Sequence, residues 1–127
     1  MTVKQISVFL ENRYGQLHEI TDILAKAGID LRAINIAETT DYGIVRLLVD
    51  DVPAATDVLI GAGCVVSVNP VQVIAVANKS GGLNEVLGKI AAANIDIEYM
   101  YSTVDGANEE AKLVFKVDKP EELEKII

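Results

Sequence analysis

The sequence of 127 residues contains few of the side chains that build disulfides, metal sites and nucleic-acid surfaces. Its only cysteine, Cys64, excludes an intramolecular disulfide, and no CxxC or Cys/His cluster is present to hold zinc. Aromatic residues make up 5% of the chain, and 11 basic residues stand against 19 acidic ones, giving a formal net charge of −8. Because phosphate binding needs a basic face and RNA-recognition sheets need aromatics, we expect no nucleic-acid partner.

Long apolar runs are missing as well. No stretch approaches the run of about 18 or more apolar residues that indicates a membrane-spanning helix. Residues 1–15 lack the continuous apolar region and the cleavage site of a secretory signal. A single cysteine is typical of a reducing compartment. We therefore expect a soluble cytoplasmic protein with no membrane partner.

An internal repeat changes the expected organisation of the chain. The two copies are offset by 66 positions, the difference between Asn78 and Asn12. Residues Asn12, Gly15, Leu17, Glu19, Ala25, Ala27, Ile29 and Asp30 recur as Asn78, Gly81, Leu83, Glu85, Ala91, Ala93, Ile95 and Asp96. Instead of one domain of ordinary size, we predict two copies of one unit, residues 1–69 and residues 70–127.

The same order of elements is expected in each copy. Short β-branched runs at 3–10 and 71–77 predict strands, and each is followed by a turn and by apolar residues at helical spacing. Residues 29–39 with 44–49, and 95–103 with 112–117, indicate hairpins, and a second helix and a strand at 64–68 complete the first copy. The order predicts an α+β fold of two tandem ferredoxin-like βαββαβ units, each a two-layer sandwich with an antiparallel sheet.

The second copy stops inside its second helix, so its last strand is missing. A missing strand leaves an unpaired sheet edge and an uncovered apolar face. Either the natural chain continues past Ile127, which we favour, or a partner covers this edge.

The loops between the first strand and the first helix of each copy are the candidate ligand site. They consist of Asn12, Arg13, Tyr14, Gly15, Gln16 and Leu17, and of Asn78, Lys79, Ser80, Gly81, Gly82 and Leu83. A glycine at a helix start lets a ligand approach the backbone, and the free N–H groups of the first turn attract a carboxylate. The amides of Asn12 and Asn78 offer partners to an ammonium group and to a carboxylate. Alternatively, Asn and Gly form turns only, and Leu17 and Leu83 anchor the core.

These loops resemble the D/N-x-x-G-x-L signature that opens the first helix of ACT domains. Residues 28–31 and 94–97 are similar to that family's transition into its second strand. Two departures stand out: Tyr14 and Ser80 replace the commoner proline, and Asn94 replaces a glycine. The resemblance implies a free-standing tandem module that binds a small effector, most often an amino acid, and regulates an associated metabolic enzyme. It also implies a site between this loop and the second strand of a neighbouring unit, where Asn35 is the polar candidate and Tyr101 its counterpart.

Catalysis is not expected, because no base and nucleophile share a useful spacing. His18 stands alone on an expected solvent face, and Cys64 is expected to pack as a small apolar side chain. We expect no enzyme activity, no cofactor and no metal. The alternative function is an interaction module that has kept the fold, lost its ligand and assembles with a partner protein; an enzyme of unrecognised type is the third. A homodimer is expected, because paired units leave edges or faces that symmetry can cover.

Overall fold

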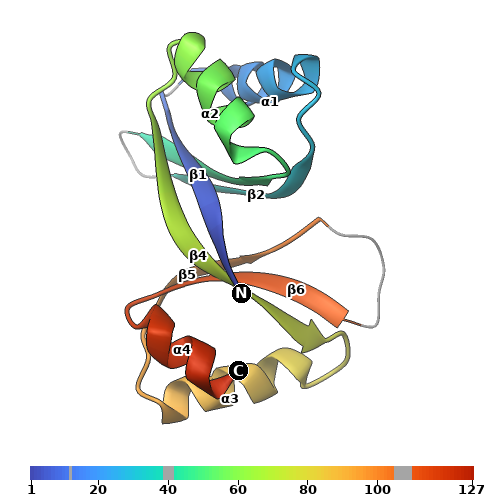
Figure 1. The fold of residues 1–127 in the computed structure, drawn as a ribbon, viewed down its shortest axis with the longest axis vertical. Coiled ribbons are helices and arrows are strands. Elements are labelled where there is room, and N and C mark those ends of the chain that lie inside the picture. The colour runs from blue at the N-terminus through green and yellow to red at the C-terminus, as the bar shows by residue number, and fades with distance from the viewer. Residues whose placement is uncertain (12, 39–41, 105–109) are drawn as a thin grey trace. The chain divides into compact units, whose positions relative to one another are not determined.

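The computed structural model describes residues 1–11, 13–38, 42–104 and 110–127 (Figure 1). In chain order the elements are β1 (Thr2–Leu10), α1 (Gln16–Lys26), β2 (Leu31–Glu38), β3 (Gly43–Val49), α2 (Val52–Gly61), β4 (Val66–Ala77), α3 (Gly82–Ala92), β5 (Ile97–Ser102), β6 (Glu110–Val117) and α4 (Pro120–Ile126). This order confirms the predicted α+β class and its tandem ferredoxin-like units. Among the described residues, no helix combines the length and the apolar character needed to cross a membrane.

The chain divides into two compact units. The N-terminal unit comprises Lys4–Asn69, and the C-terminal unit comprises Met1–Val3 together with Pro70–Ile127. In the N-terminal unit the strands follow the order β2-β3-β1-β4, and β3 pairs antiparallel with both β1 and β2. Helices α1 and α2 cover one face of these strands (Figure 1).

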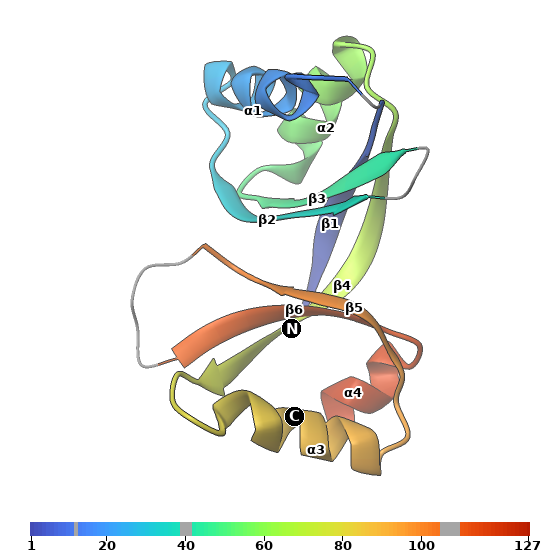
Figure 2. The same ribbon diagram turned by 180° about the vertical axis from the view of Figure 1, so that it is seen from behind.

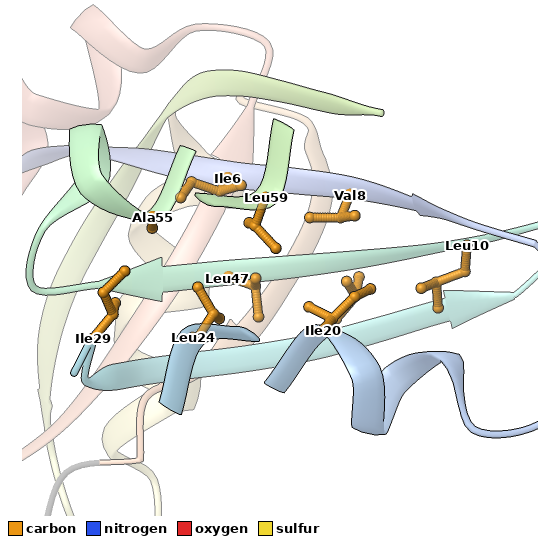
Figure 3. Packing of buried hydrophobic residues seen from close by; sticks show 10 residues of the cluster. Ile6, Val8, Leu10, Ile20, Leu24, Ile29, Leu47, Ala55 and Leu59 are labelled. Atoms are coloured by element: carbon orange, nitrogen blue, oxygen red, sulfur yellow. The ribbon is translucent and has the colours of Figure 1, made fainter. Parts of the chain in front are cut away.

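The core of the N-terminal unit lies between the two helices and the sheet (Figure 3). Alternate residues of β1 face the helices, because successive side chains of a strand point to opposite faces. The cluster consists of Ile6, Val8, Leu10, Ile20, Leu24, Ile29, Val45, Leu47, Ala55 and Leu59. Since Leu10 ends β1 and Ile20 lies in α1, burial of these two side chains anchors the intervening loop at both ends.

The C-terminal unit repeats this arrangement. Strand β6 pairs antiparallel with β4 and with β5, and α3 and α4 cover one face (Figure 2). Its core consists of Ile74, Val76, Ile90, Ile95, Leu113, Phe115, Val117 and Leu123. Both copies also tie the start of the second strand in the same way: Asp30 N–H donates to Asp50 Oδ1 at 3.0 Å, and Asp96 N–H donates to Asp118 Oδ1 at 2.9 Å.

The edge of β4 in the C-terminal unit is paired with the N-terminal residues of the chain. Met1 N donates to Val73 O at 3.2 Å, and Val73 N donates to Met1 O at 2.8 Å. The hydroxyl of Thr2 donates to Glu124 Oε1 at 2.6 Å, which fastens this segment to α4. The expectation of an unpaired edge is therefore not met at Val73.

A second difference concerns β4 itself. The sequence predicts two strands, at 64–68 and 71–77, because Asn69 and Pro70 interrupt the pattern. The structure instead has a single strand of 12 residues, Val66–Ala77. Proline fixes φ near the value of extended backbone and removes only a donor, so a strand can continue through it where that donor is not needed.

Candidate functional site

The loop between β1 and α1 enters the helix through a glycine in the left-handed conformation. Gly15 has φ 81° and immediately precedes Gln16, the first residue of α1. A Cβ added at Gly15 would meet no atom within 4 Å, so the backbone conformation, rather than lack of space, favours glycine. Among the described residues, no side chain caps α1, so N–H groups of its first turn lack a side-chain partner there and face the loop.

A pocket of about 290 Å³ lies at this helix entrance, close to the lower end of the range of about 300–1,000 Å³ that is usual for ligand pockets. It is lined by Leu10, Glu11, Arg13, Tyr14, Gly15, Gln16, Leu17, Ile36 and Gly43. All of these residues belong to the N-terminal unit. The structure therefore brings five of the predicted site residues, Arg13 to Leu17, to one pocket, while Asn12 lies outside the described residues.

Gln16 carries an unusual polar atom. Its Oε1 is buried and accepts no hydrogen bond from any residue that the structure describes. Burying a carbonyl without a donor costs about 1–3 kcal/mol, so such atoms are rare and need an explanation. Gln16 also lines a neighbouring pocket of about 170 Å³ against residues 62–65. A ligand at this helix entrance can supply that donor only if the Gln16 side chain turns its oxygen toward the pocket.

Charged groups surround the same entrance. Arg13 makes a two-pronged ion pair with Glu19, with Nη1–Oε1 and Nη2–Oε2 distances of 2.8 Å, and its Nε lies 3.5 Å from Glu11 Oε2. The hydrogen bond from Arg13 lowers the pKa of Glu19, and the same bond raises the pKa of Arg13. Both side chains of the pair are about half exposed, so the pair adds little to stability and a ligand carboxylate can compete for Arg13.

The other residues predicted for the N-terminal copy divide between pocket and core. Tyr14 is fully exposed at the rim, and Leu17 both lines the pocket and packs against the core. Asn35 is not in the pocket: its Oδ1 accepts a hydrogen bond from Arg46 Nη1 at 3.3 Å. The next residue on β2, Ile36, lines the pocket instead, and strand alternation puts Asn35 on the opposite face.

The loop of the C-terminal unit is folded against itself. Gly81 has φ 84°, matching Gly15, and Asn78, Lys79 and Ser80 are exposed. Lys79 N donates to Ala77 O at 2.9 Å, and Gly82 N donates to Lys79 O at 3.0 Å. Gly82 is buried, and a Cβ there would overlap the Ala77 carbonyl oxygen. Leu83 packs against the core of its unit.

Sequence reasoning missed Leu10, Glu11, Ile36 and Gly43, which line the pocket beside the predicted loop. Ile36 is a large apolar side chain that the structure leaves 53% exposed on a strand, and this exposure is not visible in the sequence pattern. His18 is exposed on α1, and Cys64 packs partly against the core, where burial raises the pKa of its thiol. Within the described ranges, no three His, Cys, Asp or Glu side chains gather as metal ligands.

Two repeats of a two-layer α+β sandwich define a tandem ferredoxin-like protein. The family model of the ACT domain pair matches residues 1–127, and the chain belongs to this family. Family membership confirms the resemblance seen in the loops.

Solved structures show the same fold. A protein from Bacteroides thetaiotaomicron is similar at 38% identity with a TM-score of 0.91, over 99% of this chain and 86% of that one. The regulatory subunit of aspartate kinase from Thermus thermophilus, in its ligand-free form, is similar at 14% identity with a TM-score of 0.69, over 99% and 94% of the two chains. Its counterpart from Thermus flavus gives 14% identity and a TM-score of 0.61, over 99% and 92%. No match was found among curated proteins.

Proposed function

We propose that this chain senses a free amino acid at the entrance of α1 and controls an associated metabolic enzyme. The observation that carries the proposal is the buried Oε1 of Gln16, which accepts no hydrogen bond from the described residues, beside a pocket of about 290 Å³. The chain shares its fold with regulatory subunits of aspartate kinase, and this likeness is what suggested enzyme control for the proposal.

The groups around the pocket complement the two charged ends of an amino acid. Its ammonium group can pair with the exposed carboxylate of Glu11 and, once the Gln16 side chain turns its Oε1 toward the pocket, can donate to that oxygen. Its carboxylate can accept from the free N–H groups at the start of α1 and pair with Arg13. Leu10 and Ile36 leave room for a small apolar side chain rather than a charged one.

Regulation then follows from linkage. A ligand stabilises whichever arrangement of module and enzyme binds it more tightly, and it shifts that equilibrium only by its differential affinity, typically about 1–3 kcal/mol. The partner enzyme and the homodimer expected from the sequence both belong to this proposal. Light scattering at micromolar concentration tests the homodimer, which a monomer would contradict.

Thermal unfolding in the presence of each common amino acid tests the proposal directly. A ligand at 100 times its dissociation constant adds about 2.7 kcal/mol of stability, which raises the melting temperature in a concentration-dependent way. The Arg13→Ala variant should lose most of this shift, because its guanidinium no longer meets the carboxylate. If no amino acid produces a shift in melting temperature or a heat of binding, the proposal is wrong. Capture of one specific enzyme, unaffected by any amino acid, would then favour the alternative of a ligand-free module that assembles with a partner protein.

A further inference from the structure

We propose that only the N-terminal loop binds the ligand, so that each chain takes up one amino acid even though the loop is present twice. This inference rests on the proposed function and specifies it. Its basis is a difference between two loops that otherwise share their sequence register and their left-handed glycine, at φ 81° and φ 84°.

The first difference lies at the first helical residue. Gln16 and Gly82 occupy equivalent positions, offset by 66. In the C-terminal loop the carbonyl of Ala77 packs so closely on Gly82 that no Cβ fits between them. In the N-terminal loop the same position carries a Cβ and the rest of a glutamine side chain, so the backbone cannot close in this way. The space that Gln16 holds open is filled by backbone in the C-terminal unit.

The second difference is the loss of the side chains that form the pocket walls. With the same offset, Glu11, Tyr14 and Ile36 correspond to Ala77, Ser80 and Ser102. A carboxylate, an aromatic ring and a branched apolar group are replaced by three small side chains. The C-terminal loop thus keeps a cation, Lys79 in place of Arg13, but it lacks the carboxylate and the glutamine that would meet an ammonium group and the walls that would enclose a ligand.

Two glycine variants form a matched pair for the test. Gly15→Ala and Gly81→Ala impose the same left-handed strain, and a Cβ meets no atom within 4 Å at either position. Both should lower the melting temperature to a similar extent. With the amino acid found by thermal shift, calorimetry should give one site per chain, Gly15→Ala should weaken binding by about tenfold or more, and Gly81→Ala should change it by less than about twofold.

Arg13→Ala and Lys79→Ala provide a second matched pair, at exposed positions where no backbone strain arises, in case a glycine variant fails to fold. Only Arg13→Ala should weaken binding. Two sites per chain, equal losses in both members of a pair, or a loss confined to Gly81→Ala or Lys79→Ala would overturn this inference while leaving amino-acid sensing intact. Absence of binding by any amino acid would instead refute the proposed function, and this inference with it.

Discussion

Replacing Gln16 by methionine should stabilise the ligand-free protein while removing ligand binding. The buried Oε1 accepts no hydrogen bond from the described residues, and an unpaired buried acceptor costs about 1–3 kcal/mol. Methionine has a similar unbranched shape without the acceptor, so Gln16→Met should recover about 1 kcal/mol. For a chain of this size that gain corresponds to a rise in melting temperature of about 4 °C. Replacing a buried polar group by an apolar one costs stability when that group had a hydrogen-bond partner in the folded protein, and can stabilise the protein when it had none.

Gln5 supplies the matched control within the same unit. It is completely buried, but its Nε2 donates to Ser7 Oγ at 3.2 Å. Gln5→Met should therefore destabilise the protein by about 1–3 kcal/mol, opposite in sign to Gln16→Met. Calorimetric melting of both variants without ligand, followed by titration with the amino acid, separates the two effects. One hydrogen bond contributes a net free energy of about 1 kcal/mol to stability. If Gln16→Met lowers the free energy of unfolding by about this much or more, the oxygen of Gln16 has a partner in the free protein and the reasoning is refuted.

Three further predictions concern stability. Leu24 is 1% exposed in the core, so Leu24→Ala should cost about 2–5 kcal/mol in urea unfolding. Asp51 caps α2 by accepting a hydrogen bond from Ala54 N–H at 3.1 Å. Asp51→Ala should therefore cost about 1 kcal/mol in the same assay. An unchanged midpoint of the urea transition would contradict this prediction. The hydrogen bond from Arg13 holds the pKa of Glu19 in the folded protein below its ordinary value of 4.5. The stability that this bond contributes is therefore present above pH 4.5 and is lost as the pH falls through the lower pKa of the folded state. Melting temperatures measured across this acid range should therefore fall less steeply in Glu19→Gln than in the unmodified protein.

The repeated helices and their ends could be predicted from sequence because local geometry dictates them. A helix buries residues three or four apart, and Ile20 and Leu24 show this spacing in α1. The chain leaves the first helix of each copy through a left-handed residue, and only glycine or a short polar side chain adopts that conformation readily. Gly28 at φ 72° and Asn94 at φ 56° lie at these predicted positions, even though the two residues differ.

The pairing of the N-terminal residues with β4 could not be predicted, because strand pairing is not a local property. Met1 and Val3 alternate with Thr2 as in the start of any half-buried strand, and nothing in that pattern names Val73 as a partner. Pro70 added to the difficulty, since a proline within an apolar run is normally evidence of a break between strands.

The composition of the site was predictable only in part, for a similar reason. The glycine and the polar loop identify the helix entrance, but the strand residue that completes the pocket depends on the phase of β2. A register irregularity between Leu31 and Ala33 shifts that phase, so alternation counted from the start of the strand does not reveal that Ile36, rather than Asn35, reaches the pocket.

The two copies separate the residues that maintain the fold from those that serve the site. The bond from Asp30 to Asp50 recurs between Asp96 and Asp118, and apolar residues fill the same helix faces in both units. These positions can hardly change without loss of packing. The pocket position does change, because Gln16 becomes Gly82 and the fold survives by closing backbone onto the vacated space. Since function resides in the site rather than in the fold, the sequence repeat alone implies two similar units, but it does not imply two binding sites.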